Sequence, residues 1–311
     1  MSVPVEVAKV RQAAWPTLPL AEWKDTLATL HRWVQVVGKT RLALAPPVNH
    51  WWHVALYLTS RGLGTSPMWY GDRTFEVELD FIDHNLLVST GDRAIGTLPL
   101  LPRTVADFYR EYTALLNSLG LRVSIWPVPS EMEDQLPFAQ DQQHRSYDPE
   151  AVARCWGILS QAGRVLQRFR SGFLGKCSPV HFFWGAFDLA CTRFSGRRAP
   201  LHPGGFPHLP DRVVREAYSH ECISAGWWPG GGPVADAAFY SYSYPEPPGF
   251  AQTRLRLAEA YYSPELREFV LPYEAVRRAP DPDAMLLDFL ENTYETGADL
   301  GGWDRKAVER S

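Results

Sequence analysis

Apolar residues recur every three or four positions in four stretches of the chain, which is the spacing of helices that bury one face. The first stretch begins at Leu20 and ends before Gly38, a common C-terminal stop. Thr104, Asp148 and Asp281 precede the other three at the position where a side chain caps the first turn, and proline follows both aspartates. The pattern predicts amphipathic helices over residues 20–37, 105–119, 149–173 and 282–296.

Between these helices, apolar and polar residues alternate with the period of two that is typical of half-buried antiparallel strands. The alternation covers residues 75–90, 218–228, 238–244 and 267–271, and it places Tyr240, Tyr242 and Tyr244 on one strand face. Antiparallel strands between flanking helices indicate an α+β fold.

One stretch occurs twice, at residues 38–61 and 175–193. Each copy opens with Gly-Lys, reaches a histidine followed by bulky aromatic residues, and ends in Thr or Ser and Arg. When His50 is aligned with His181, Trp51 matches Phe182, Trp52 matches Phe183 and Leu58 matches Leu189. The alternation predicts a strand in each copy, His50–Thr59 and His181–Thr192.

This duplication predicts two pseudo-symmetric αβ repeats, each with a long helix, several mostly antiparallel strands and a closing helix. The first covers residues 1–147 and includes an N-terminal arm and a proline-rich linker, and the second covers residues 148–311. We expect the two repeats to form one compact unit, with a cleft between them as the site of ligand binding.

Composition excludes some classes of partner. The net charge of the 311 residues is −4, whereas nucleic-acid-binding proteins generally carry a basic surface, so we expect no nucleic-acid partner. No apolar run approaches the ~18 residues of a membrane span, and the N-terminus lacks the apolar core of a signal peptide. The four cysteines contain no C-x-x-C pair. We therefore expect a cytoplasmic protein without a membrane partner.

Familiar catalytic motifs are incomplete in this chain. A phosphate-binding loop at Gly38-Lys39 requires glycine five residues earlier, where Trp33 stands. His220-Glu221 begins a zinc-protease motif, but Ser224 replaces its second histidine. No nucleophile elbow is present. We therefore predict no metal site, and the sequence names neither a cofactor nor a reaction class.

The segments at residues 30–44, 49–62, 178–200, 218–221 and 238–247 resemble a bacterial family of proteins of about this length, catalogued only as a domain of unknown function. The resemblance covers nearly the whole chain, from Trp15 to Trp303. It implies a bacterial, soluble, single-unit protein and supplies no activity, cofactor or catalytic residue.

Candidate site residues come from polar positions that interrupt the aromatic segments. Asp188 lies within an apolar strand, where a carboxylate needs either a structural partner such as Arg193 or Lys176, or a catalytic role. The acid–base or ligating candidates are His181, Asp188, His220, Glu221 and Glu246. The substrate-binding candidates are Lys39, His50, Trp51, Lys176, Trp184, Arg193, Tyr242 and Tyr244. The aromatic residues among them alternatively belong to a rigid core.

These residues suggest an enzyme acting on a small organic molecule, anionic or aromatic, in an aromatic-lined cleft. The alternative is a ligand-binding or sensor module that has the same pocket without a positioned acid or base. A structural or interaction protein would instead expose its aromatic residues as a patch.

Overall fold

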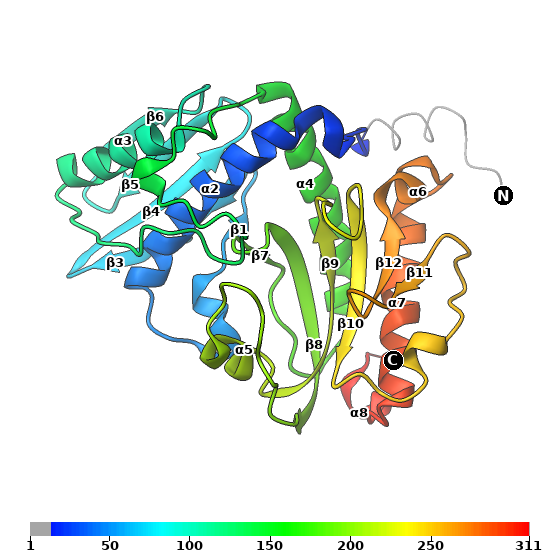
Figure 1. Cartoon of the computed structure of the whole chain (residues 1–311). Coiled ribbons are helices and arrows are strands. Elements are labelled where there is room, and N and C mark those ends of the chain that lie inside the picture. The colour runs from blue at the N-terminus through cyan, green and yellow to red at the C-terminus, as the bar shows by residue number, and fades with distance from the viewer. Residues whose placement is uncertain (1–13, 311) are drawn as a thin grey trace.

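The computed structural model describes residues 14–310, so most of the predicted N-terminal arm lies outside the described residues. The fold mixes helices with two antiparallel sheets (Figure 1), which confirms the α+β prediction. None of the helices in the described part of the chain has the length and apolar character to cross a membrane.

The first half of the chain forms a long helix, a sheet and a second helix. Its sheet has the strand order β1-β2-β4-β5-β6, and the short β3 pairs with β4. The elements are α2 (Leu20–Leu44), η1 (Asn49–Val54), β1 (Tyr57–Leu58), β2 (Gly62–Gly64), β3 (Met68–Tyr70), β4 (Arg73–Asp80), β5 (Asn85–Thr90), β6 (Ile95–Pro99) and α3 (Val105–Ser118).

A segment with one short 3-10 helix, η2 (Phe138–Gln140), leads into the second half, where the sheet order is β7-β8-β9-β10-β12-β11. The elements are α4 (Pro149–Ser171), β7 (His181–Phe183), β8 (Asp188–Arg198), α5 (Asp211–Ala217), β9 (His220–Trp228), β10 (Ala238–Tyr244), η3 (Phe250–Gln252), β11 (Tyr261–Ser263), β12 (Glu268–Pro272), α6 (Tyr273–Arg278), α7 (Pro282–Leu300) and α8 (Arg305–Val308).

The two sheets meet at their edges. The amide of Leu56 donates to the carbonyl of Phe182, and the amide of Phe182 donates to the carbonyl of Leu56, both at 2.9 Å. One hydrophobic cluster runs from Trp15 to Trp303 and includes residues of both sheets. The two halves therefore share one continuous core.

The predicted helix starts are confirmed, but two predicted stops are wrong. Thr104, Asp148 and Asp281 each accept a hydrogen bond from a backbone amide of the first turn. The helix α2 continues past Gly38, and α7 continues past Gly297. Both glycines allow close packing instead: a Cβ on Gly38 would lie 2.3 Å from Trp184, and one on Gly297 would lie 2.8 Å from Ile223.

The repeated stretch does not form two matching strands. Residues His50 to Val54 belong to the 3-10 helix η1, and only Tyr57–Leu58 of the predicted first strand lies in a strand of the first sheet. The predicted second strand is a hairpin, because β7 ends at Phe183 and β8 begins at Asp188. The structure pairs Leu56 with Phe182, so the alignment of Trp51 with Phe182 does not describe equivalent positions.

The second sheet has two different faces. Helices α4 and α7 pack against one face (Figure 1), where Leu189, Ile223, Trp227, Phe239 and Leu271 join the core. The opposite face carries polar and aromatic side chains, because alternate residues of a strand point to opposite sides. That face forms the floor of the main cavity.

Candidate functional site

A cavity of about 810 Å³ lies on the second sheet, between the two halves of the chain. The first half contributes the end of α2, η1 and the segment around Ser130 and Glu131, and the second half contributes the sheet floor and α5. We call it the main cavity. Its position agrees with the expectation of a cleft between the halves, and its volume falls in the range of about 300–1,000 Å³ that is usual for small-molecule sites.

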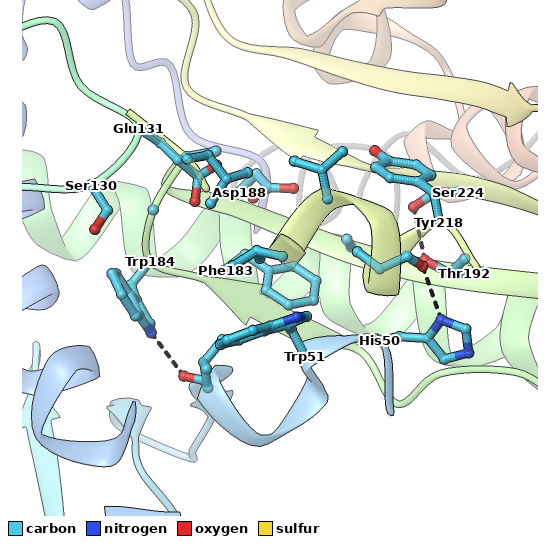
Figure 2. Close-up of a pocket in the computed structure, with 18 of the residues that line it drawn as sticks. His50, Trp51, Ser130, Glu131, Phe183, Trp184, Asp188, Thr192, Tyr218 and Ser224 are labelled. Atoms are coloured by element: carbon cyan, nitrogen blue, oxygen red, sulfur yellow. Dashed lines mark hydrogen bonds between the residues drawn. The ribbon is translucent and has the colours of Figure 1, made fainter. Parts of the chain in front are cut away.

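The strand alternation gathers the polar groups of the floor. Neighbouring strands align Thr192 with Ser224 and Ser224 with Tyr242, so these side chains form a row across the sheet. The hydroxyls of Thr192 and Ser224 are 2.9 Å apart (Figure 2). The polar side chains of the floor are Asp188, Thr192, Ser224, Tyr240, Tyr242 and Glu268.

Asp188 is held by a tyrosine from two strands away. The hydroxyl of Tyr240 donates to Asp188 Oδ2 at 2.5 Å. Its ring reaches Asp188 by crossing Gly226, where a Cβ would lie 2.7 Å from the tyrosine oxygen. Only glycine leaves room for this contact. Because Tyr240 occupies one carboxylate oxygen as a neutral donor, Asp188 keeps a free oxygen for a ligand.

Three carboxyl groups share the main cavity, and the pKa of each is raised towards neutrality. Burial, together with the negative charge of Asp188, raises the pKa of Glu131 to about 7 and that of Glu268 to about 8. Burial raises the pKa of Asp188 to about 6, against the opposing hydrogen bond from Tyr240. Carboxyls with such values exchange protons readily at physiological pH.

Lys39 is the ammonium group nearest these acids. Burial lowers the pKa of Lys39 to about 8, although the charge of Glu131 opposes this shift. Its Nζ donates to the Ser130 hydroxyl at 2.7 Å and lies 5.3 Å from the ring of Trp184. The cavity thus combines three acids with one weakened base.

One face of α2 fixes the two loops that carry Glu131 and Trp184. Gln35 exchanges two hydrogen bonds with the backbone of Ser130, at 2.7 and 2.8 Å. His31 Nε2 lies 2.9 Å from the carbonyl oxygens of both Trp184 and Gly185, to which it donates. Burial lowers the pKa of His31 to about 4, so the ring is neutral. Helical spacing of four residues aligns His31, Gln35 and Lys39 for this purpose.

Glu131 rests on the loop that His31 holds. A Cβ at Gly185 would lie 1.9 Å from Glu131 Oε1, so glycine is required where the carboxyl contacts the backbone. Protein surrounds the carboxyl, yet the side chain keeps accessible surface because it faces the open space of the cavity. Figure 2 shows Glu131 beside Asp188 at one end of the cavity.

Aromatic side chains form the walls. Trp51 lies across from the sheet floor, and Trp184 donates from Nε1 to the Val54 carbonyl at 2.8 Å (Figure 2). His50 and Trp51 both have left-handed backbone angles, with φ of 58° and 61°. Such conformations are costly for residues other than glycine and concentrate at functional sites. The further aromatic wall residues are Trp52, Trp126, Phe183, Phe194, Tyr218 and Trp228.

His50 closes the end of the cavity opposite the acids. Its Nδ1 lies 2.9 Å from the Ala217 carbonyl of α5, and its Nε2 lies 2.6 Å from Lys176 Nζ. The ring of His220 is 5.6 Å away. Burial lowers the pKa of His50, so the neutral ring donates to Ala217 and accepts from Lys176. Lys176 therefore supports His50 from outside the cavity lining.

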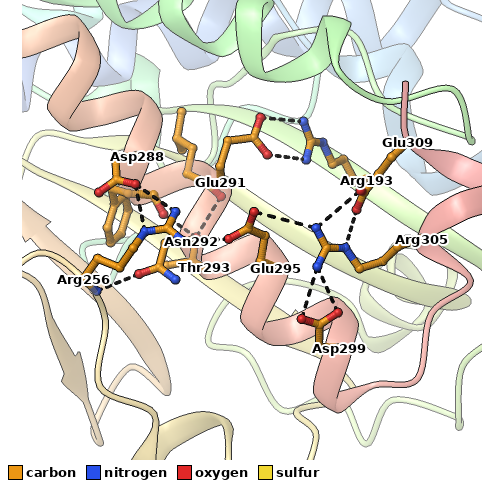
Figure 3. Close-up of polar contacts among 12 residues, drawn as sticks. Arg193, Arg256, Asp288, Glu291, Asn292, Thr293, Glu295, Asp299, Arg305 and Glu309 are labelled. Atoms are coloured by element: carbon orange, nitrogen blue, oxygen red, sulfur yellow. Dashed lines mark hydrogen bonds and ion pairs between the residues drawn. The ribbon is translucent and has the colours of Figure 1, made fainter. Parts of the chain in front are cut away.

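Arg193 lies on the opposite face of the sheet, so its predicted role in substrate binding is wrong. Its guanidinium is 1% exposed and forms two hydrogen bonds with Glu291 of α7, at 3.0 and 3.2 Å (Figure 3). It also lies 3.5 Å from the ring centroid of Phe169. Arg193 is not a partner for Asp188 either. The two residues are an odd number of positions apart on β8, so their side chains point to opposite faces of the sheet.

Several other candidates lie outside the main cavity. Glu221 accepts from Ser195 and Arg197, and Glu246 accepts from Tyr262 and Arg267. The hydroxyl of Tyr244 donates to the Pro200 carbonyl, and His220 lies beside His50 with its Nδ1 3.1 Å from the Ser219 hydroxyl. Among the acid–base candidates, the structure places Asp188 alone in the main cavity, and His181 lines a second, smaller one. Lys39, His50, Trp51, Trp184 and Tyr242 do line the main cavity.

Sequence reasoning missed Glu131, Glu268 and the hydroxyl of Tyr240 as site groups. Glu268 had a signal, because the alternation in its strand places it with Val270 and opposite the buried Phe269. Glu131 had none, since it lies in an irregular segment whose position depends on Gln35. Among residues 14–310, no group of three or more His, Cys, Asp or Glu side chains has the arrangement to hold a metal ion.

The chain belongs to the DUF5996 family, a family of unknown function whose model matches residues 15–310. No curated protein and no solved structure matches the chain.

Proposed function

We propose that this protein is an enzyme that transfers protons to or from a small organic molecule carrying a cationic nitrogen and an aromatic or apolar body. The observation that carries the proposal is the group of three carboxyls in one aromatic-walled cavity, with pKa values of about 6, 7 and 8. Groups that titrate near the working pH are the most effective general acids and bases.

The acidic end of the cavity decides the class of ligand. Three acids and two cationic groups, Lys39 and Arg212, line the cavity, whereas the predicted anion-binding residues Lys176 and Arg193 do not. Arg212 lies against Trp51, 5.3 Å from its ring centroid. An anionic substrate would meet Asp188 and Glu131 at close range, whereas an ammonium group would pair with them. Tryptophan and tyrosine walls add favourable contacts to a cation or a flat ring.

Asp188 is the proposed base. The hydrogen bond from Tyr240 orients the Asp188 carboxylate and leaves one of its oxygens free. The pKa of Asp188, about 6, keeps this carboxylate mostly ionised at neutral pH. Glu268, with a pKa of about 8, is mostly protonated there and is the proposed acid. Carboxyls whose surroundings separate their pKa values in this way have the division of roles that acid–base catalysis needs.

Binding is tested with phenethylamine, and with phenethyl alcohol as the uncharged analogue. We expect tryptophan fluorescence to report binding of the amine and at least tenfold weaker binding of the alcohol. Affinity for the amine should rise between about pH 6 and about pH 9, because Glu131 and Glu268 become negative while Lys39 becomes neutral. Asp188→Asn should weaken binding several-fold.

Glu246→Gln is the matched control, because this carboxylate lies outside the main cavity. It should leave the affinity for the amine unchanged. Equal binding of amine and alcohol, or an Asp188→Asn variant that binds like the native protein, would exclude the cationic ligand class.

The alternative is a binding or sensor module that uses the same cavity without catalysis. It is favoured by the hydrogen bond that already occupies one oxygen of Asp188. Incubation of the protein with a cell metabolite extract separates the two. If the native protein is an enzyme, a cationic metabolite should be consumed and a product of different mass should appear. The Asp188→Asn variant should cause neither change. A metabolite that binds and is recovered unchanged would identify a binding module.

We also propose that the two halves descend from a duplicated αβ unit. Each half runs from a long helix into an antiparallel sheet and on to a further helix, and the sheets meet in an antiparallel pairing at Leu56 and Phe182. Such a pairing is expected where a two-fold axis relates two edge strands. Relatives whose halves show no matching positions in a sequence alignment would contradict this origin.

A reducing, cytoplasmic location is proposed from the cysteines. All four are free, including Cys177 and Cys191, whose sulfur atoms are 3.8 Å apart. In an oxidising compartment such neighbours would be expected to join. Rapid alkylation of the protein in intact cells should label the thiols of this pair, and recovery of a Cys177–Cys191 disulfide would contradict the location.

A further inference from the structure

A second cavity of about 320 Å³ lies on the other side of η1 from the main cavity. The end of α2, η1, β1, β3 and the start of β7 surround it. Trp52 lines both cavities. The second cavity contains two polar groups whose hydrogen-bonding capacity is not met within the described chain, His181 and Arg41.

His181 is a buried imidazole without a hydrogen-bond partner. Its side chain is 1% exposed, and neither ring nitrogen has a partner among the described residues. Burial, together with the charges of Arg41 and Arg170, lowers the pKa of His181 to about 4, so the ring is neutral. A buried polar group left unpaired is energetically unfavourable. His181 lines the second cavity, so a turn of its ring towards that space gives one N–H a hydrogen-bond acceptor in a bound molecule.

Arg41 is a cation without a counter-ion. One of its terminal nitrogens donates to the Thr65 carbonyl, its Nε is buried and unpaired, and it forms no ion pair with any described residue. The guanidinium carbon lies 5.5 Å from the ring centroid of Tyr57, which also lines the second cavity. Burial lowers the pKa of Arg41, but a guanidinium stays protonated in proteins. The guanidinium is partly buried, and its side-chain hydrogen-bond partner Tyr57 is not a carboxylate, so an anion that enters the cavity can pair with it.

The remaining walls are apolar and aromatic. They include Trp52, Met68 and Trp69 together with three prolines, and no Asp or Glu lines the cavity. Its volume equals that of about ten water molecules, at ~30 Å³ each. A single-ring acid such as benzoate has fewer heavy atoms than that and fits the space. Inorganic anions would leave the aromatic walls without contacts.

From these observations we propose that the second cavity binds a small organic carboxylate with a flat, apolar body. Arg41 pairs with the carboxylate, His181 donates to one of its oxygens, and Trp52 and Trp69 contact the body. The proposal does not depend on the proposed function of the main cavity, because its polar groups, Arg41 and His181, lie outside that cavity and its ligand has the opposite charge. Trp52 is the one contact residue of the proposal that also lines the main cavity.

The test uses benzoate as the probe, with benzyl alcohol and inorganic phosphate as comparison ligands, in calorimetric titrations of the full chain. We expect native protein to bind benzoate at least tenfold more tightly than either comparison ligand. Arg41→Met should weaken benzoate binding at least tenfold, and His181→Phe should weaken it several-fold. His181→Phe keeps a ring in place and removes the unpaired nitrogens, so this variant should fold even if Arg41→Met does not.

Arg256→Met is the matched control for the loss of an arginine, because Arg256 lies far along the chain in exposed ion pairs with Asp288 and Glu295. It should bind benzoate like the native protein. Phosphate binding as tight as that of benzoate would overturn the organic class. Undetectable benzoate binding at millimolar concentration, or equal affinity in native protein and His181→Phe, would overturn the site.

Discussion

Single glycines decide how closely the two halves approach, and Gly38 is the clearest case. It lies inside α2, where alanine would favour the helix by up to ~1 kcal/mol, but a Cβ there would lie 2.3 Å from Cδ1 of Trp184. Trp184 cannot move away easily, because it is buried and bonded to the Val54 carbonyl. We therefore expect Gly38→Ala to lower the free energy of unfolding by about 2 kcal/mol, measured by urea denaturation.

Gly157→Ala is the control for this substitution. Gly157 is also helical, in α4, but its nearest neighbour would be Cγ of Pro16 at 3.6 Å, an ordinary contact. It should gain up to ~1 kcal/mol of stability. If Gly38→Ala and Gly157→Ala were equally stable, close packing against Trp184 would not be the reason for glycine at position 38.

The raised pKa of Glu268 predicts how the stability of the chain depends on pH. Glu268 has a pKa of about 8 in the folded chain, against an ordinary value of 4.5. The folded chain therefore binds the Glu268 proton more tightly than the unfolded chain does. The stability that this proton contributes is lost as the pH rises from about 4.5 through about 8. Glutamine mimics the protonated form, so Glu268→Gln should be more stable than native protein by about 1–2 kcal/mol at pH 9 and equal to it at pH 5.

Thermal unfolding of both proteins across this pH range measures the difference. Glu246→Gln serves as the comparison, since its carboxylate bonds to Tyr262 and Arg267 and its loss should destabilise the chain. A stability difference at Glu268 that does not widen with pH would show that its carboxyl is not desolvated.

At the scale of elements, the polar contacts behind the second sheet hold α7 in place. Arg193 projects from β8 into the space beneath α7 and pairs there with Glu291, while Arg305 joins Asp299 and Glu309 nearer the C-terminus (Figure 3). Because Arg193 is almost fully buried and Glu291 is not, removing the arginine leaves a partly buried carboxylate unpaired. Arg193→Met should therefore cost about 3–5 kcal/mol of stability.

The exposed pairs of Arg256 provide the comparison, because Arg256→Met should cost less than ~1 kcal/mol. Chemical denaturation measures both variants. Neither should change the affinity for phenethylamine once folded. A folded Arg193→Met variant with native stability would argue that shape, and not charge pairing, positions α7.

Elements were predictable where local chemistry decides them. The caps at Thr104, Asp148 and Asp281 need only a side-chain oxygen and the next few amides, and all three formed as predicted. The ends of α2 and α7 were not predictable, because Gly38 and Gly297 serve contacts with residues far along the chain. The 3-10 helix at His50 was missed for a similar reason, since a left-handed backbone followed by aromatic residues leaves no periodic signal.

The candidate site was predictable in part. Asp188 and Tyr242 were found because a strand alternates, and that rule works without knowing the partner strand. Arg193 was assigned wrongly because its sequence position near a loop hid the fact that the same alternation turns it towards α7. Glu131 was out of reach, because its place depends on Gln35 and Gly185, which are far from it in the sequence.

At the scale of the whole molecule, segments distant in sequence cover the main cavity together. The covering segments are η1, the stretch around residues 126–131 and α5, while the floor belongs to the second sheet. His50 of η1 bonds to the carbonyl of Ala217 of α5, and the amide of Glu131 donates to the carbonyl of His208, just before α5. A ligand that fills the cavity therefore touches all three covers at once.

This arrangement predicts how hydrogen exchange responds to a ligand. Saturation with phenethylamine should slow amide exchange several-fold in residues 49–54, 126–131 and 209–218 together, because local opening of each cover would require loss of ligand contacts. Helix α7, on the far face of the sheet, is the internal control and should exchange at an unchanged rate. Mass-spectrometric detection resolves these segments as separate peptides. Protection of one cover without the others, or protection of α7 to the same extent, would show that the ligand lies outside the main cavity, and the assignment of Asp188 and Glu268 as its acid–base pair would then be wrong.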